Sequence, residues 1–170
     1  TDLGAAPLTI SSVGLGGADP SDFAETDTCA GTTLQPGGVC HIAVGFGPTA
    51  VGSRTASLVI TDNAPDSPRT LTLTGNGVAP VAILSSSNVS FGDQPMGTQS
   101  ATQTVYLSNA GSAPLTISSV VLDGANPGDF AETDTCSGAT LQPGGACNIA
   151  VGFNPTATGS RAASLTITDN

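Results

Sequence analysis

The most constraining feature of this sequence is an internal repeat that covers most of the chain. The run DFAETDTC at residues 22–29 returns at residues 129–136. Across the paired ranges 1–63 and 108–170, 47 of 63 positions carry the same residue. A period of about 100 residues is the size of one small domain, so the chain must be built from one structural unit written out more than once.

Both ends of the chain fall inside a repeat. The first copy has no counterpart of residues 80–107, and the second copy has no counterpart of residues 64–79. We therefore expect one unit at 1–79 that lacks its first strands and another at 80–170 that lacks its last strand. Two interpretations remain open. Either the sequence is a window of a longer array, or neighbouring chains supply the missing strands to exposed sheet edges.

Alternation of apolar and polar residues predicts β-strands in both copies. The alternation covers residues 40–46, 57–61, 70–74, 104–108 and 115–118. Each run places one face toward a core and a face rich in Thr and Ser toward solvent. Breakers such as QPGG and DNAPDSP separate the runs, as expected of turns. About seven short strands per period predict an all-β fold of tandem antiparallel β-sandwiches.

Helical periodicity is weak throughout the sequence. No window of about 12 residues carries a convincing apolar stripe at helical spacing. The exception is a short helical turn that we expect around residues 20–24, where a proline opens the segment and Phe23 points inward.

Each copy contains a pair of cysteines, and the two pairs have the same spacing. The first pair is Cys29 and Cys40, and the second is Cys136 and Cys147. Pairing within each copy is the natural inference, and such a bridge stabilises a fold by about 3 kcal/mol in the chain-entropy estimate. A metal site is the alternative, but it usually needs closer spacing and more ligands. Disulfides indicate an oxidising compartment, so we expect an extracellular or cell-surface protein.

The charge composition excludes several functional classes. The chain has three arginines, no lysine and a formal net charge of −10. Such a chain cannot neutralise a phosphate backbone, so we expect no nucleic-acid partner. No apolar run reaches the roughly 18–20 residues that a membrane-spanning helix needs, so we expect no membrane insertion in this segment.

No constellation of reactive residues recurs in both copies. His41 is the only histidine, and its counterpart is Asn148, so no catalytic triad is present twice. Acidic residues gather in turns, for example at Asp19, Asp22 and Asp27. Their spacing matches no known calcium loop, and turn-capping roles are commoner than Ca²⁺ binding. We expect no catalytic, cofactor-binding or metal-ligating residues, and the chain is not expected to be an enzyme.

A carbohydrate- or protein-binding adhesin or accessory module is the alternative function. Tyr106 is the one aromatic residue suited to stacking on a sugar, and Asn88 begins a glycosylation sequon. Binding specificity would then reside where the copies differ. These positions are Gly14/Val121, Asp19/Asn126, Val39/Ala146, His41/Asn148 and Val51/Thr158.

The combined motifs resemble a known bacterial family. APLTISSV, DFAETDTC, LQPGG, the FGPT/FNPT turn and TDN, together with the paired cysteines, resemble choice-of-anchor D repeats. Those repeats are similar to immunoglobulin-like domains of the hydin/abnormal-spindle type, which are related to the major-sperm-protein fold. The resemblance implies tandem immunoglobulin-like sandwiches on long exported surface proteins, and it brings no catalytic residues.

From the repeat and this resemblance we expect a structural tandem-repeat module. It would form a surface stalk or an extracellular filament, with strand exchange between units as a further expectation. Its expected partners are neighbouring repeats or copies of itself, and glycans are a further candidate.

Overall fold

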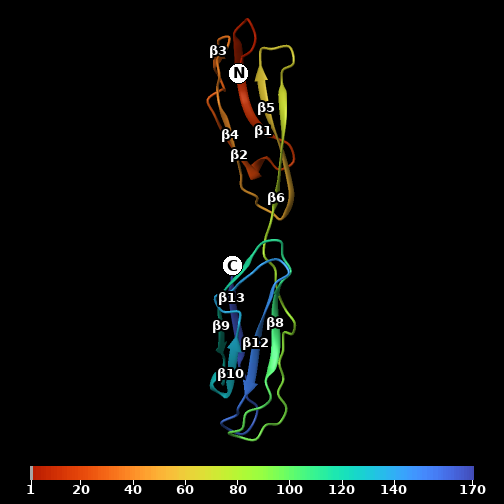
Figure 1. The fold of residues 1–170 in the computed structure, drawn as a ribbon, viewed down its shortest axis with the longest axis vertical. Coiled ribbons are helices and arrows are strands. Elements are labelled where there is room, and N and C mark those ends of the chain that lie inside the picture. The colour runs from red at the N-terminus through yellow and green to blue at the C-terminus, as the bar shows by residue number, and fades with distance from the viewer. Residues whose placement is uncertain (1) are drawn as a thin grey trace. The chain divides into compact units, whose positions relative to one another are not determined.

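The computed structural model describes residues 2–170 and divides into two compact units. Unit 1 extends to Val78, and unit 2 spans Ala79–Asn170. Figure 1 draws unit 1 in red to yellow and unit 2 in green to blue. Apart from two short 3₁₀ helices, the regular elements are all strands, so the all-β prediction is confirmed.

Unit 1 consists of two antiparallel sheets. Its elements are β1 (Leu8–Gly16), the 3₁₀ helix η1 (Pro20–Asp22), β2 (Phe23–Asp27), β3 (Thr33–Leu34), β4 (Ile42–Phe46), β5 (Gly52–Asp62) and β6 (Arg69–Gly77). One sheet has the order β3-β1-β5-β6, and the other contains β2 and β4. The two sheets share a small core in which Ile10 of β1 and Ile42 of β4 belong to one cluster, so unit 1 is a sandwich.

Unit 2 repeats this architecture with a different set of strands. Its elements are β7 (Ala82–Leu84), β8 (Gln103–Asn109), β9 (Leu115–Asp123), η2 (Pro127–Asp129), β10 (Phe130–Asp134), β11 (Thr140–Leu141), β12 (Ala146–Phe153) and β13 (Ser164–Asp169). The sheets have the orders β10-β12-β8-β7 and β11-β9-β13. Leu107, Ile117 and Ile149, from β8, β9 and β12, are almost fully buried between the sheets.

The sequence repeat relates the strands of the two units. The strands β1 to β5 of unit 1 correspond to β9 to β13 of unit 2, whereas β6, β7 and β8 have no counterpart among the described strands of the other unit. A strand is shorter wherever its partner is missing. The strand β12 begins with residues 146–148, which pair only with β8, and their counterparts 39–41 are not strand in unit 1. Likewise, β5 pairs over residues 52–56 only with β6, and the counterparts 159–163 are not strand in unit 2.

Two local predictions need correction. The strand predicted at 40–46 begins only at Ile42, because its first residues lack a β8-like partner. The helical turn predicted at 20–24 ends at Asp22, and Phe23 already begins β2. The N–H of Phe23 bonds to the carbonyl of Pro20 and closes the turn, and Phe23 then pairs with Phe46 of β4. Phe23 is buried, as predicted.

Candidate functional site

A buried carboxylate joins three distant segments of unit 1. Oδ1 of Asp22 accepts hydrogen bonds from the backbone N–H of Thr49 at 3.1 Å and from its hydroxyl at 2.6 Å. Oδ2 of Asp22 accepts from Nε of Arg54. The same guanidinium reaches Asp19, with Nη2 at 2.6 Å from Oδ1. We call Asp22, Thr49 and Arg54 the carboxylate clamp of unit 1.

Unit 2 contains the same clamp, formed by Asp129, Thr156 and Arg161. The bonds from Thr156 to Oδ1 are again 3.1 Å and 2.6 Å, and Nε of Arg161 donates to Oδ2. Because both oxygens of each carboxylate already accept hydrogen bonds, the clamp has the chemistry of a structural tie and not of a reactive site. The sequence carried a signal for it, since two of the three arginines recur at the repeat period.

Hydrogen bonds set the ionisation of the clamp. The side-chain hydrogen bond from Thr49, followed by that from Arg54, lowers the pKa of Asp22 despite its burial. Thr156 and then Arg161 lower the pKa of Asp129 in the same way. The hydrogen bond to Asp22 also raises the pKa of Arg54. Asp22 and Arg54 are therefore both charged across the neutral pH range.

Both expected disulfides are present in the structure. Cys29 bonds to Cys40 and Cys136 bonds to Cys147, and each pair has a Cα–Cα distance of 5.2 Å. Cys29 and Cys136 belong to the buried core clusters of their units. Each bridge therefore ties the loop after β2 or β10 to the segment at the start of β4 or β12. This is a structural role.

The acidic residues of the turns bind backbone amides. Oδ1 of Asp27 accepts from the N–H of Cys29 at 2.5 Å, and Oδ1 of Asp62 accepts from that of Ala64 at 2.8 Å. Burial raises the pKa of Asp134, but hydrogen bonds from Ser137 and Cys136 outweigh it, so the pKa lies below its usual value. Within residues 2–170, no three His, Cys, Asp or Glu side chains gather as metal ligands would.

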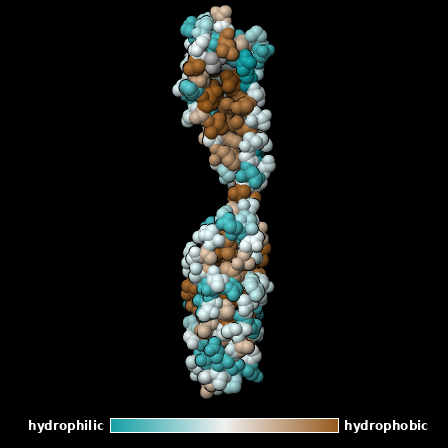
Figure 2. Space-filling model, in the orientation of Figure 1, coloured by the Kyte–Doolittle hydropathy of each residue, from teal (hydrophilic) through white to brown (hydrophobic). Residues whose placement is uncertain are grey.

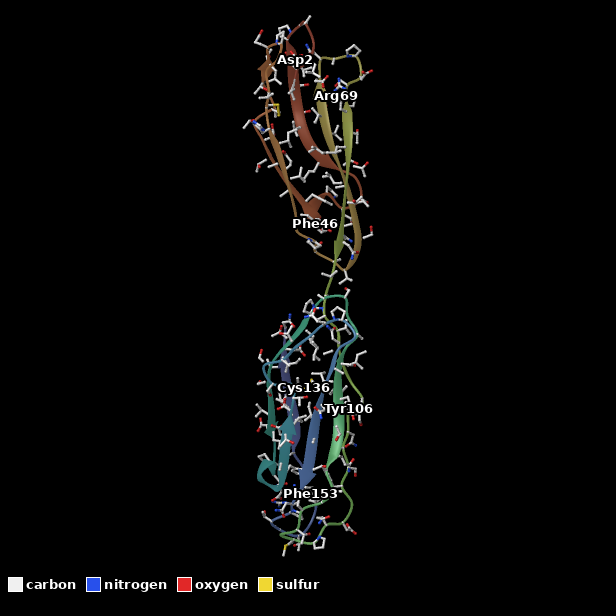
Figure 3. The ribbon with its side chains drawn as sticks, in the orientation of Figure 1. Asp2, Phe46, Arg69, Tyr106, Cys136 and Phe153 are labelled. Carbon is white, nitrogen blue, oxygen red and sulfur yellow. A yellow bond between two sulfur atoms is a disulfide. The ribbon has the colours of Figure 1, made fainter. Side chains whose placement is uncertain are left out.

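The remaining residues that the sequence singled out lie apart on the surface. His41 is exposed, and its backbone N–H donates to the hydroxyl of Thr28 at 3.0 Å. Tyr106 of β8 is 55% exposed and is labelled on unit 2 in Figure 3. Asn88 is exposed as well. None of the helices in the described part of the chain has the length and apolar character to span a membrane.

The inner face of β4 distinguishes unit 1 from unit 2. Val44 and Phe46 are 40% and 42% exposed, whereas their counterparts Val151 and Phe153 are 7% and 9% exposed. In unit 2, β8 pairs with β12, and Phe91 packs on Phe153 with ring centroids 5.7 Å apart. Nothing in unit 1 takes these places among the described residues. Phe46 and Phe153 are both labelled in Figure 3.

The sheet opposite β4 contributes to the same exposed area. Leu71 of β6 is 57% exposed, although its cross-strand partner Leu58 is only 3% exposed. Directly paired residues share a sheet face, so Leu71 points toward the interior of the sandwich and lacks a cover there. We call Val44, Phe46 and Leu71 the open face of unit 1. Figure 2 shows hydrophobic residues gathered on unit 1.

The fold and the repeated clamps and disulfides define a pair of immunoglobulin-like β-sandwich units. Residues 80–170 match the family described as HYDIN/CFA65/VesB-like, Ig-like domain, and the chain belongs to this family. The comparison with curated proteins found no match.

Two solved structures are similar to this chain at low identity. One is a protein of unknown function from Porphyromonas gingivalis W83, with 16% identity, a TM-score of 0.41, and coverage of 97% of this chain and 79% of that chain. The other is the secreted serine protease VesC from Vibrio cholerae, with 15% identity, a TM-score of 0.37, and coverage of 99% of this chain and 45% of that chain. The chain thus spans less than half the length of VesC.

Proposed function

We propose that this chain is a structural module of a secreted protein in which immunoglobulin-like units follow one another in an array. The observation that carries the proposal is the repetition of a whole unit, since 47 of 63 paired positions are identical. The repetition includes the clamp and the disulfide, which hold a fold together and provide no reactive group. Immunoglobulin-like domains of this family are generally non-enzymatic, which agrees with a structural role.

A structural array needs units that resist opening. In each unit a covalent bridge joins two cysteines 11 residues apart. A charged hydrogen-bonded clamp joins residues 32 positions apart. The linker between the units is short, because β6 ends at Gly77 and β7 begins at Ala82. Pro80 further restricts the backbone of this linker. These features favour a stalk or filament that spans distance.

The finer proposal concerns the setting of the array. The choice-of-anchor D repeats that the sequence resembles belong to exported surface proteins, and disulfides form in the same oxidising compartments. We therefore place this module on a bacterial surface or in an extracellular filament, with neighbouring repeats or copies of itself as partners.

The proposal is tested by small-angle X-ray scattering of the chain and of a variant with a Gly-Gly-Ser-Gly insertion after Val78. An array with stiff linkers predicts a narrow distribution of distances between the units, and the insertion should broaden this distribution. Electron micrographs of the native protein should then show rods or fibres. Identical scattering from both chains, or compact native particles, would reject the stalk or filament.

A further inference from the structure

We propose that the open face of unit 1 binds a further copy of the segment 79–107, supplied by another repeat of the same sequence. Unit 2 provides the template, because its own copy of this segment covers the equivalent face. The inference rests on the proposed array for the source of the segment, and it assigns a strand-addition site to the edge of β4.

The hydrogen-bonding edge for such a strand is already present. In unit 2, β8 pairs with residues 146–151 of β12, with Val105 opposite Ile149 and Leu107 opposite Cys147. The counterparts of Ile149 and Cys147 are Ile42 and Cys40. Among the described residues of unit 1, β4 pairs with β2 on one side only, so its other edge presents free backbone groups.

Further contacts of the segment lie beyond the ladder. The carbonyl of Ala79 accepts hydrogen bonds from the N–H groups of Ser112 at 2.9 Å and Ala113 at 3.1 Å. The counterparts of these donors are Ala5 and Ala6. Within the described residues of unit 1, no carbonyl takes the place of that of Ala79. A bound segment would therefore be held at both of its ends.

Apolar complementarity fixes which face of the segment turns inward. Val105 and Leu107 are buried in unit 2, whereas Thr104 and Tyr106 point outward and are exposed. Phe91 adds a ring against the phenylalanine at the end of β12. The open face of unit 1 offers identical residues to such a strand, because Val44 and Phe46 replace Val151 and Phe153.

The opposite edge of the same sheet is protected against strand addition. Glu25 of β2 lies on the inward-facing side, opposite Val44, and its Oε2 is buried without a hydrogen-bond partner. An inward-pointing charge at an edge discourages pairing with a further strand. The strand β4 carries no acidic or basic side chain, so the edge of β4 can accept a further strand whereas the edge of β2 discourages one.

A second copy of this chain is a poor donor for thermodynamic reasons. Its segment 79–107 is already part of unit 2, where Leu107 is almost fully buried. Donating the segment would open one core in order to close another, with no net gain in buried area. A segment that is not already packed into a unit of its own closes the core of unit 1 without that loss.

The test uses the full chain and a synthetic peptide with the sequence of residues 79–107. Hydrogen exchange is followed at the amides of Ile42–Phe46 with and without peptide. We expect exchange there to slow by about tenfold or more. A peptide with Val105→Asp and Leu107→Asp should give no protection. A matched peptide with Thr104→Asp and Tyr106→Asp, which alters only the outer face, should protect β4 as the original does.

Three results would overturn the inference. The first is unchanged exchange in β4 at saturating peptide, and the second is protection that does not distinguish the two variant peptides. The third is a concentration-dependent dimer of the chain alone with β4 protected, which would make a second copy the occupant. Each result leaves the scattering test of the array untouched, so the two proposals fail separately.

Discussion

Asp2 and Asn109 occupy the same position in the two units but differ in hydrogen bonding. Nδ2 of Asn109 donates to the carbonyl of Leu141 at 2.9 Å. Oδ1 of Asp2 accepts from the N–H of Gly4 at 2.8 Å, and its buried Oδ2 has no partner. We expect Asp2→Asn to stabilise unit 1 by about 1 kcal/mol, because the amide can donate to the carbonyl of Leu34, the counterpart of Leu141.

Hydrogen exchange of the core amides of unit 1 measures this gain without interference from unit 2. The reciprocal change Asn109→Asp serves as the matched control and should weaken unit 2. If Asp2→Asn leaves exchange in unit 1 unchanged, the two positions are not equivalent.

The pKa shifts of Glu132 and Asp129 have opposite directions, so they predict opposite pH dependences for the stability of unit 2. Burial, and then the charge of Asp134, raises the pKa of Glu132, so its ionised form costs stability above that raised pKa. We expect Glu132→Gln to raise the melting temperature at pH 7 and to have no effect once Glu132 is protonated, below about pH 4. Thermal unfolding between pH 3 and 8 gives both comparisons.

The stability contribution of the clamp residue Asp129 depends on pH in the opposite direction, because the pKa of Asp129 is lowered. Its contribution is complete above its ordinary pKa of 3.8 and is lost as the pH falls through the lower folded value. Asp129→Asn should therefore lower the melting temperature at neutral pH, with the difference closing only in strong acid. A loss that stays constant across the whole pH range would show that Asp129 acts through packing.

At the scale of elements, β4 and β12 provide matched strands with and without cover. Val151→Ala should destabilise unit 2 by about 2 kcal/mol, because it removes buried methyl groups. Val44→Ala should cost less than half as much, since Val44 is already partly exposed. Denaturant unfolding with unit-specific exchange readouts makes the comparison. Equal losses would mean that the face of β4 is covered in solution.

The disulfides stabilise two cores of different size. Among the residues that the structure describes, the buried cluster of unit 1 has three members and that of unit 2 has nine. Replacing Cys29 and Cys40 by serine should remove about 3 kcal/mol and unfold unit 1. The same replacement of Cys136 and Cys147 should leave unit 2 folded with a lower melting temperature. Peptide mapping without reduction checks the pairing, and free thiols in the unchanged chain would contradict it.

The strand pattern was predictable where alternation was regular and was missed where polar groups face inward. Residues 57–61, 70–74 and 104–108 lie within the observed β5, β6 and β8. The strands β2 and β10 were missed because FAETD places a glutamate on the inner side, which breaks the apolar alternation. The clamp was also missed, because the recurrence of the arginine marks its position but does not show which aspartate, 32 residues away, it contacts.

At the scale of the whole molecule, the position of the openings depends on sheet order and not on the repeat alone. In the part of the chain that the structure describes, no strand pairs with the free edge of β4 in unit 1, and none pairs with the free edge of β13 in unit 2. Identical residues thus become core in one unit and surface in the other. No local pattern can show this, because burial depends on pairing between distant segments.

The same logic predicts how unit 2 can be completed. In unit 1, β6 pairs with β5 over residues 52–60. A second copy of residues 64–79 added after Asn170 should pair with β13 and its preceding segment in the same register. It would close the pocket whose apolar lining includes Leu84, Phe91 and Leu165. We expect a higher melting temperature for unit 2 and new strand structure at residues 159–163.

The control for this extension carries Leu71→Asp and Leu73→Asp in the added copy only. These two positions face the interior in β6, because they pair with the buried Leu58 and Ala56. The charged copy should stay unpaired and leave unit 2 unchanged. Burying two unpaired carboxylates costs more free energy than the new backbone hydrogen bonds of the strand pair contribute. If both extensions raise the melting temperature equally, pairing beside β13 is not the cause. If neither does, the sheet of unit 2 already ends at β13, and the period of the sequence repeat does not define the folding unit.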